Sequence, residues 1–477
     1  MAFPGTRHWT PIDAEAAAAR GWDVVIAGSS FAAMFFLMGL PQGLSVLVIE
    51  KGPVQPHEDQ LARGLGGAED FAQDNRSGHR KDWIAHSLFG GNSHCWWACT
   101  PRFHPHDFRM GTLYGRGMDW PLGYGDLEPH YADVEDAMQI AGGGSDHILP
   151  RSRPFPFAPH AGSRTDAVLR AADDRWFAQP TARSNGGARA VCCTNGVCNL
   201  CPVDAKFTIL NGLESFDRPG THLLLGAEVR ALDIGAGTAR AVEVRLPDGS
   251  ARSIRADLVA LGTNAVFNAA ILMRSGLTAP ALGRYLHEQV SQMVTLDIDR
   301  PNYFGATSIT GHGYGFYDGS HRRDHAAVLM ENWNAPPAIR PVPGRWTERL
   351  LLKLIAEDLP QADNRVVLDG DSPRLIWQGH DPYAAAGLAA VRAALPDALP
   401  FRVEGMTASP LSATEAHIQG TTRMGRDVTE GVIDRDLRCF EARNVLALGA
   451  GAFPSCSPAN PTLTLSALSL RAARVLA

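Results

Sequence analysis

A glycine turn between two apolar runs constrains the fold of this chain more than any other feature. Residues 23–27 (DVVIA) form the first run, and a turn at residues 28–33 (GSSFAA) follows it directly. A helical segment then covers residues 34–38, and a second apolar run at 45–49 leads into Glu50. Strand, tight turn, helix, strand and acid within about 30 residues is the pattern of a dinucleotide-binding βαβ unit.

The chemistry of such a unit gives these residues their expected roles. Glycine lets the backbone approach a pyrophosphate, the helix N-terminus offers free N–H groups, and an acid placed like Glu50 accepts a hydrogen bond from a ribose hydroxyl. This copy carries Ser30 and Ala33 where the usual motif has its second and third glycines. The alternative interpretation, an ordinary strand–turn–helix of another kind of α/β protein, therefore remains open. We predict a bound adenine dinucleotide, FAD or NAD, held by Gly28, Ser29, Ser30, Phe31, Ala32, Glu50 and Lys51.

Further segments of strand character are scattered along the chain. Residues 257–261 and 444–448 are apolar runs, and residues 247–249 (PDG) are typical of a hairpin turn. Residues 52–80 are polar and are expected to form a loop or lid, whereas about 291–415 alternate short strands with polar loops. Because pieces of one α/β sheet lie far apart in the sequence, we predict a discontinuous two-domain enzyme.

Composition excludes several classes of protein. The net charge of −6 leaves no basic footprint for nucleic acid, and no apolar run approaches the roughly 18 residues that a membrane helix needs. The 477 residues are long enough to bury a large core without disulfides. The N-terminus has no charged region followed by an apolar one, so a cytoplasmic location is expected, with periplasmic export on a partner as the alternative.

Five motifs carry a family resemblance. They are residues 90–97 (GGNSHCWW), 100–105 (TPRFHP), 120–122 (WPL), 417–425 (HIQGTTRMG) and 453–464 (FPSCSPANPTLT). In this order they resemble the signatures of the glucose–methanol–choline (GMC) flavoprotein oxidoreductases. The resemblance implies FAD as the cofactor and the oxidation of an alcohol C–H to a carbonyl.

The same resemblance implies the architecture. The expected fold is α/β, with a Rossmann-like FAD-binding domain and a second, α+β substrate domain on a mixed or antiparallel sheet. We assign residues 18–118, 219–290 and 430–477 to the FAD-binding domain. Residues 119–218 and 291–429 are assigned to the substrate-binding domain, which includes a cysteine cluster at 192–201.

By resemblance, His417 is the active-site histidine, and Asn460 stands where the family carries a second His or Asn. Hydride leaves the alcohol carbon toward the flavin N5 only as the hydroxyl proton departs, so a base such as His417 is required. The Asn460 amide can stabilise the developing alkoxide. Further FAD contacts are expected at Gly90, Gly91, Asn92, Ser93, Val229, Gly449, Ala450, Asn460, Pro461 and Thr462.

The attachment of FAD depends on the Gly-Gly segment. Some members of the family bind FAD covalently through a histidine there. Here Cys95, and not His94, directly precedes Trp96. Non-covalent FAD is therefore expected, with covalent attachment as the alternative.

Four of the eight cysteines lie within ten residues. Cys192, Cys193, Cys198 and Cys201 read C-C-x4-C-x2-C-P, and thiolates at such spacing can converge on a metal in a compact loop. Adjacent side chains diverge, so one of Cys192 and Cys193 with Cys198 and Cys201 gives three thiolates, which suit a cuboidal cluster that lacks one iron. Zinc with a further ligand, and reduced or disulfide-linked cysteines, remain alternatives.

The residues after the cluster (203–208, VDAKFT) extend the resemblance to the catalytic subunits of bacterial FAD-dependent glucose and glucoside dehydrogenases. Those proteins carry a [3Fe-4S] cluster in this region. The resemblance therefore implies such a cluster here, a sugar, glycoside or related polyol as substrate, and a small subunit and a cytochrome or other electron acceptor as partners.

Three other functions remain open. An oxidase would reduce dioxygen to hydrogen peroxide and keep the cysteine cluster as a structural element. A non-catalytic flavin-binding or structural subunit would keep the fold without turnover. A nicotinamide-dependent dehydrogenase has no support beyond the N-terminal turn.

Overall fold

The predicted βαβ unit lies at the centre of the first sheet. The structure, a computed structural model, describes residues 3–143, 148–334 and 346–476. In it β2 (Gly21–Ala27) pairs in parallel with β3 (Val46–Glu50) and with β9 (Ala251–Leu261), and β9 pairs in parallel with β18 (Ala442–Ala447). The four strand segments expected from their apolar runs are therefore confirmed as neighbours in one sheet. Their runs are continuous because a parallel sheet is covered on both faces.

Five more strands complete this sheet. Its order is β1-β6-β3-β2-β9-β18-β17, and the antiparallel pair β7 and β8 joins it through β9. The turn at residues 247–249 connects β8 to β9, as the hairpin prediction expects. The added strands are β1 (Thr10–Pro11), β6 (Thr221–Leu225), β7 (Glu228–Gly235), β8 (Thr238–Arg245) and β17 (Arg438–Cys439).

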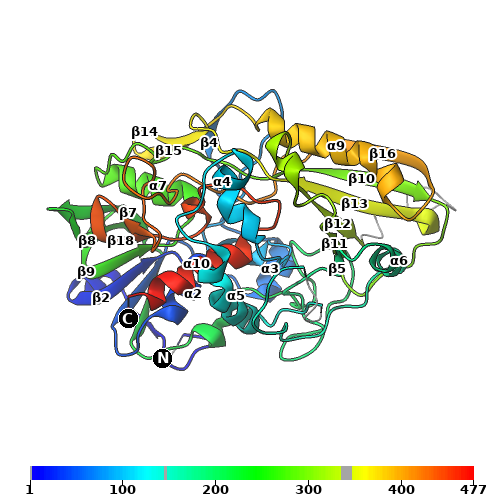
Figure 1. The fold of residues 1–477 in the computed structure, drawn as a ribbon. Helices are drawn as coiled ribbons and strands as arrows, with labels where there is room; N and C mark the ends of the chain where they lie inside the picture. Colours follow the sequence, from blue (N-terminus) through cyan, green and yellow to red (C-terminus); the bar gives the residue numbers. More distant parts are fainter. Residues whose placement is uncertain (1–2, 144–147, 335–345, 477) are drawn as a thin grey trace.

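Helices from distant parts of the chain cover the first sheet. The C-terminal helix α10 (Thr462–Arg474) packs against both α2 (Phe31–Gly39) and α5 (Tyr124–Met138), and Figure 1 shows the three together. A Cβ atom on Gly39 would lie 2.7 Å from the carbonyl oxygen of Leu470, so glycine permits the close approach of α2 and α10. The C-terminal end of the chain thus completes the helical layer over the N-terminal βαβ unit.

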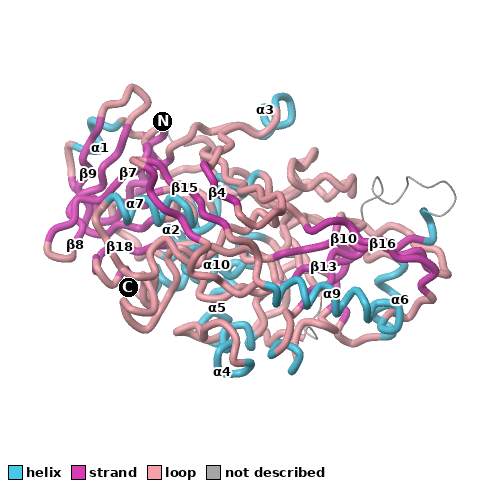
Figure 2. The backbone as a smooth tube through the Cα atoms, turned by 90° about the horizontal axis from the view of Figure 1, so that it is seen from above, coloured by secondary structure: helices cyan, strands magenta, loops and turns pink. Residues whose placement is uncertain are grey.

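The second sheet is antiparallel throughout. Its order is β16 (Val403–Leu411), β10 (Val290–Ile298), β13 (Arg349–Ala356), β12 (Val328–Trp333), β11 (Ile309–Gly313) and β5 (Trp176–Ala178). Helix α9 (Pro382–Ala398) packs on it, and side chains such as Leu352 and Leu388 join one buried cluster. Figures 1 and 2 place this sheet at the end of the molecule opposite to the first sheet. The predicted fold class, α/β with a second α+β part, is confirmed, while the domain boundaries stay a prediction.

Two regions differ from the sequence expectation. Residues 52–80 are not a plain loop, because they contain α3 (His57–Arg63) and β4 (Ala72–Asn75). The polar β4 is a strand through its parallel pairing with β15 (Ser372–Trp377), which also pairs with β14 (Arg365–Asp369). Residues 291–415 contain the long helix α9, which an expectation of short strands and loops missed.

The remaining elements are short helices and turns of 3-10 helix. The structure places them at α1 (Ala14–Ala18), η1 (Gly91–His94), η2 (Pro105–Arg109), α4 (Met110–Tyr114), α6 (Arg164–Ala172), η3 (Leu213–Phe216), α7 (Ala265–Arg274), η4 (Ser320–Arg323), η5 (Trp346–Glu348) and η6 (Ala450–Ala452).

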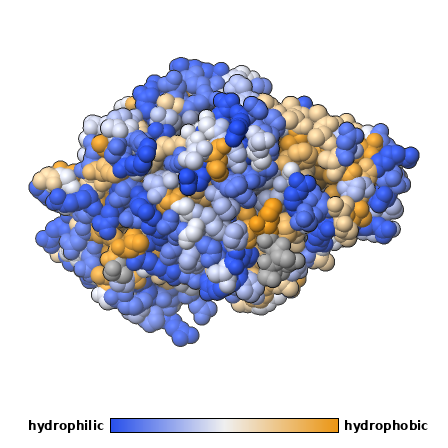
Figure 3. All heavy atoms as spheres, viewed as in Figure 1, coloured by the Kyte–Doolittle hydropathy of each residue, from blue (hydrophilic) through white to orange (hydrophobic). Residues whose placement is uncertain are grey.

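The surface is mainly hydrophilic on the face drawn in Figure 3, with a paler apolar area over α9. Among the helices of the described residues, none combines the length and the apolar character needed to cross a bilayer.

Candidate functional site

A pocket opens where β2 and β3 end, at the position that a dinucleotide-binding unit uses. Seven residues predicted to hold the dinucleotide line this pocket: Gly28, Ser29, Ser30, Glu50, Lys51, Gly91 and Val229. The lining also includes His86, Thr263, Asn264 and Phe267, which were not predicted. The fold therefore brings predicted residues from four separate segments of the sequence to one cavity.

Glu50 is held in place at the edge of this pocket. The Ser29 hydroxyl donates a hydrogen bond to Glu50 Oε2 at 2.6 Å, and the Gly52 N–H donates one to Oε1 at 2.8 Å. Burial raises the pKa of the Glu50 carboxyl to about 7, against these two hydrogen bonds. The carboxyl group is thus fixed where an acid would accept a ribose hydroxyl.

The close packing of the turn explains its unusual sequence. Gly28 has φ +91°, and a Cβ atom there would lie 2.7 Å from the carbonyl oxygen of Gly262, so this position needs glycine. Ala33 occupies the place of the third glycine of the usual motif. A Cβ on Gly262, which directly follows β9, would lie 2.9 Å from the Ala33 Cβ. In this chain Gly262, and not residue 33, is therefore the glycine that permits close packing between α2 and the end of β9.

The start of α2 is prepared for an anion. Ser30 is its N-cap residue but makes no capping hydrogen bond with its side chain, so the first N–H groups stay available. The Gly90 N–H donates to Ser29 Oγ at 2.9 Å, and a Cβ on Gly449 would lie 3.4 Å from the Ala32 Cβ. Glycine segments that precede η1 and η6 therefore meet the turn, and this cradle fits the pyrophosphate of FAD.

Other predicted FAD contacts lie near these segments. Asn92 and Ser93 are in η1, where Asn92 Nδ2 donates to the Ile84 carbonyl at 2.8 Å and Ser93 Oγ accepts from the Ile209 N–H at 3.1 Å. Phe31 is the first residue of α2, and Ala450 lies in η6. The roles of all these residues toward FAD stay predictions.

His94 has no free ring nitrogen for a covalent bond. Its Nδ1 lies 3.0 Å from Gln60 Nε2, and its Nε2 lies 2.8 Å from the Phe89 carbonyl oxygen. The ring is buried. This arrangement favours the expectation of non-covalent FAD.

His417 lies on the segment that leaves β16 and crosses toward the first sheet. Its ring is half-buried, and burial lowers its pKa to about 4, so the ring is neutral at pH 7. Glu415 and Glu331 act in the opposite direction, while the positive charges of Lys353 and Lys81 lower the pKa further. A neutral histidine of this kind can accept a proton.

Asn460 lies directly before α10. Its side chain is buried, and its Oδ1 has no hydrogen-bond partner within the described residues. The next residue, Pro461, is the N-cap of α10 and supplies no side-chain cap, so the helix N-terminus at Thr462 is open. A buried amide oxygen without a partner beside an open helix end is a polar position that could bind a ligand group.

The side chain of Gln289 contacts the segments of both predicted catalytic residues. Gln289 Oε1 lies 3.0 Å from His417 Nδ1, and its Nε2 donates to the carbonyl oxygens of Ser457 and Ala459. Ala459 directly precedes Asn460. The structure therefore brings His417 and the Asn460 segment to one residue at the start of β10, which the sequence analysis did not single out.

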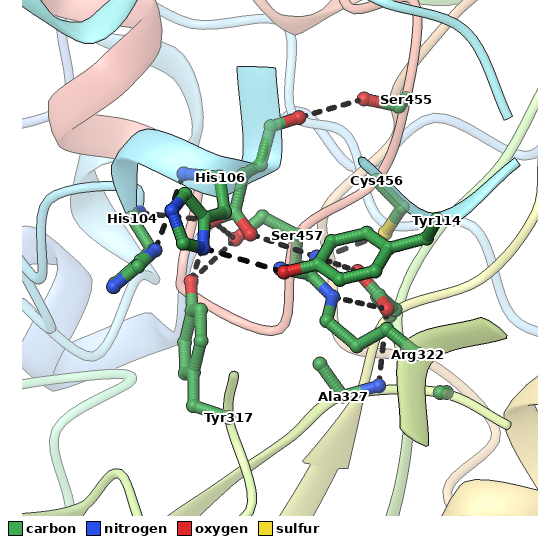
Figure 4. A network of polar contacts seen from close by, with 12 residues as sticks. His104, His106, Tyr114, Tyr317, Arg322, Ala327, Ser455, Cys456 and Ser457 are labelled. Atoms are coloured by element: carbon green, nitrogen blue, oxygen red, sulfur yellow. Dashed lines mark hydrogen bonds and ion pairs between the residues drawn. The ribbon is translucent and has the colours of Figure 1, made fainter. Parts of the chain in front are cut away.

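A buried network holds the segment before Asn460 from its other side (Figure 4). Asp107 Oδ2 accepts hydrogen bonds from Ser457 Oγ at 2.8 Å and from Tyr317 OH at 2.7 Å, and its Oδ1 accepts one from Arg322 at 2.8 Å. The Trp120 indole N–H donates to Ser455 Oγ at 2.7 Å. The 100–105 and 120–122 motifs thus lead into elements that support the C-terminal motif.

A further group near this network has the composition of a metal site. His104, His106 and Asp318 place possible ligand atoms within 4.8 Å of one another, the one such trio among the described residues. The Nδ1 atoms of both histidines are already engaged, since His106 Nδ1 and Asp318 Oδ2 are 2.8 Å apart and His104 Nδ1 accepts the His106 N–H at 3.2 Å. The Arg322 guanidinium is also 3.7 Å from Asp318. We therefore assign no metal to this trio.

The four clustered cysteines lie on one exposed loop but differ in their surroundings. Cys193 is exposed, whereas Cys198 is buried and Cys192 and Cys201 are intermediate. Cys192 Sγ is 3.6 Å from Thr307 Oγ1, and Cys198 Sγ is 3.1 Å from Ser308 Oγ. No three of these thiols meet within 4.8 Å in the described chain, so they do not form a site for a single ion such as zinc.

Two buried cations lie beside these thiols. Arg183 Nη1 is 3.7 Å from Cys198 Sγ, and the Lys206 ammonium donates to the carbonyl oxygens of Cys198, at 2.7 Å, and Trp96, at 3.0 Å. Neither cation has an ion-pair partner in the described part of the chain, and burial lowers the pKa of Lys206 to about 8. Buried charges are normally paired. The positive charge of these two residues beside the thiols would favour an anionic group there, and neither residue was singled out from the sequence.

Comparisons with known proteins agree with this geometry. A family model described as GMC oxidoreductase matches residues 360–469. The chain is 28% identical to 6'''-hydroxyparomomycin C oxidase of Streptomyces lividus, over 96% of this chain and 92% of the relative. It is 24% identical to the fructose dehydrogenase large subunit of Gluconobacter japonicus, over 94% and 97% of the two chains.

Solved structures share the fold. The pyridoxine 4-oxidase from Mesorbium loti superposes with a TM-score of 0.66 at 20% identity, over 95% of this chain and 99% of that one. The family model thus identifies residues 360–469 as a GMC oxidoreductase C-terminal region, and the relatives and the shared fold extend the likeness over almost the whole chain.

Proposed function

We propose that this protein oxidises a hydroxyl group of a sugar, a glycoside or a related polyol to a carbonyl. The observation that carries the proposal is the neutral, half-buried His417 facing the same side chain as the Asn460 segment. The names of the two relatives, 6'''-hydroxyparomomycin C oxidase and fructose dehydrogenase large subunit, support the oxidation of a hydroxyl compound of this kind.

The residues divide the work of the reaction. His417 takes the hydroxyl proton, and the Asn460 amide holds the same oxygen as negative charge develops on it. FAD, when bound, supplies the acceptor for the hydride. The cradle of Gly28, Ser30 and Gly91 would hold its pyrophosphate, and Glu50 its ribose.

We propose further that electrons leave through an iron–sulfur cluster, of the [3Fe-4S] type, to an external acceptor. Cys192, Cys198 and Cys201 are the proposed ligands, because Cys193 is the exposed member of the four. In a cluster each thiolate binds a different iron, so the thiolates can lie farther apart than around one ion. The unpaired cations Arg183 and Lys206 would balance its negative charge. A small subunit and a cytochrome are the proposed partners, in line with a relative that is itself named a large subunit.

The second candidate is an oxidase that passes electrons to dioxygen and forms hydrogen peroxide. It is favoured by the relative named an oxidase, which matches almost the whole chain. In that case the cysteine loop would be structural.

One preparation distinguishes these functions. The protein is purified without oxygen, and flavin, iron and acid-labile sulfide are measured on the same sample. Candidate sugars, glycosides and polyols are then added, and the flavin absorbance is followed in the wild type and in His417→Ala. Bleaching in the wild type and a loss of at least 100-fold in the variant would support the catalytic proposal. Flavin that no hydroxyl compound bleaches would favour a non-catalytic subunit, and peroxide without iron would favour the oxidase.

A further inference from the structure

We infer that Gln289 is a positioning residue that fixes the proton of the His417 ring on Nδ1 and leaves Nε2 as the free basic nitrogen. The inference rests on the proposed role of His417 as the base, and it adds which nitrogen performs that role and what selects it. A neutral imidazole carries one proton on either nitrogen, and the neighbouring hydrogen bond decides which.

The orientation of the Gln289 amide is determined by backbone carbonyls. Gln289 Nε2 lies 2.9 Å from the Ser457 oxygen and 2.8 Å from the Ala459 oxygen. A carbonyl oxygen only accepts hydrogen bonds, so the end of the amide that faces two of them must be the NH₂ group. The assignment of nitrogen and oxygen in this side chain is therefore not arbitrary.

The opposite end of the amide then acts on His417. Gln289 Oε1 is 3.0 Å from His417 Nδ1, and it also accepts a hydrogen bond from Gln419 Nε2 at 3.2 Å. Because Oε1 has no proton to give, Nδ1 must donate, and the neutral ring keeps its lone pair on Nε2. With four hydrogen bonds, the amide is saturated and has no reason to turn.

The charged groups around His417 do not make this choice. Glu415, Glu331, Lys353 and Lys81 act on the ring through their charge, and Glu288 accepts the backbone N–H of His417. They shift the balance between imidazole and imidazolium but form no recorded hydrogen bond with the ring. Among the described residues, Gln289 Oε1 is the one recorded partner of either ring nitrogen.

The same amide also sets the spacing of the two predicted catalytic residues. Gln289 directly precedes β10, so its backbone belongs to a rigid part of the second sheet. Its two ends hold the His417 ring and the carbonyls that precede Asn460. One side chain thus selects the tautomer of the base and ties the base to its partner amide.

Gln289→Met tests the inference, because methionine has a similar length but cannot accept or donate as the amide does. Gln419→Met is the matched control, since Gln419 bonds the same Oε1 but has no recorded contact with the His417 ring. The holoenzyme is labelled with ¹⁵N in its histidine rings, and His417→Asn identifies the signal. In the wild type and the control, the signal should report Nδ1–H. In Gln289→Met, both tautomers should appear.

The kinetic result should follow the tautomer. A misdirected proton in the serine-protease triad costs about 10⁴ in kcat. In Gln289→Met, the anaerobic rate of flavin reduction should fall at least tenfold at an unchanged flavin content, and in Gln419→Met it should fall less than threefold. In Gln289→Glu, the carboxylate should stabilise imidazolium and move the acid limb of the pH profile to higher pH.

The inference is overturned if the wild-type signal reports Nε2–H, or if Gln289→Met leaves the tautomer and the reduction rate unchanged. Failure of the proposed function looks different: His417→Asn would then keep the wild-type reduction rate, whatever tautomer the spectrum reports.

Discussion

The carboxylate of Glu288 accepts a hydrogen bond from the backbone N–H of His417 at 2.8 Å. The same oxygen also accepts the Glu415 N–H and the Thr414 hydroxyl, both at 2.8 Å, while the other oxygen pairs with the buried Lys81. Glu288 is fully buried. Neighbouring residues Glu288 and Gln289 thus hold the backbone and the ring of His417 separately, both from the start of β10.

Removal of this carboxylate should therefore affect stability and activity together. Glu288→Ala should lower the free energy of unfolding by about 3–5 kcal/mol, because it leaves the Lys81 ammonium buried and unpaired. Urea unfolding measures this loss. In the double variant Lys81→Met/Glu288→Met, part of the stability should return because both charges are gone. Flavin reduction should stay slow, since the His417 N–H still lacks its acceptor. Full recovery of the rate would contradict the role of Glu288.

The low pKa of His417 predicts an unusual pH profile. The proposed base works as neutral imidazole, and its pKa is lowered from its usual 6.5 to about 4. The value of kcat/KM should therefore stay level as the pH falls from 7 to 5 and drop as it passes through about 4. An acid limb near 6.5 would contradict this and would indicate a solvated ring.

Lys353→Met should move that acid limb to higher pH. The positive charge of Lys353 lowers the pKa of His417, and its Nζ is paired with Glu415 at 2.6 Å. The substitution removes the cation and leaves the Glu415 carboxylate unpaired, and both changes favour imidazolium. The pH dependence of kcat/KM measures the shift. A limb that stays in place would show that Lys353 is too far away or too well screened to act on the ring.

Two cysteine-to-serine substitutions should differ in their effect on iron content, because Cys198 is buried and Cys193 is exposed. Cys198→Ser should remove most of the iron and acid-labile sulfide, because Cys198 is buried between Arg183 and Lys206. Cys193→Ser should keep both, because Cys193 is exposed. Iron and sulfide per flavin, assayed on protein purified without oxygen, check the pair. Equal retention in both variants would refute Cys198 as a ligand.

The sequence predicted those features that local patterns encode. The apolar runs predicted the central strands of the first sheet, and several residues expected to hold the dinucleotide line one pocket, although their contacts with FAD stay a prediction. Helix α9 was missed because alanines also occupy its exposed face and obscure the helical spacing of Leu388, Val391 and Leu395. Strand β4 was missed because its polar residues become a strand only through pairing with β15. Such tertiary pairing leaves no local signal.

The candidate site divides in the same way. Motifs marked His417 and Asn460, but Gln289 contacts His417 and the carbonyl group directly before Asn460 across more than a hundred residues of sequence, and no local pattern could have singled it out. Arg183 and Lys206 were equally hidden, because a basic residue in a loop is usually solvated. Their burial beside thiols emerges only in the folded chain.

Two glycines with nearly the same backbone conformation test the dinucleotide turn. Gly28 and Gly43 have φ values of +91° and +87°, so an alanine at either position costs about 1–2 kcal/mol of backbone strain. A Cβ on Gly28 would also lie 2.7 Å from the Gly262 carbonyl oxygen, whereas a Cβ on Gly43 would meet nothing within 4 Å. Gly28→Ala should therefore separate β2 from β9 beneath the pocket and lose most of the bound flavin. Gly43→Ala should lose only stability, measured as a lower Tm at full flavin content. Equal flavin content in the two variants would show that the tight packing at Gly28 is not what shapes the pocket.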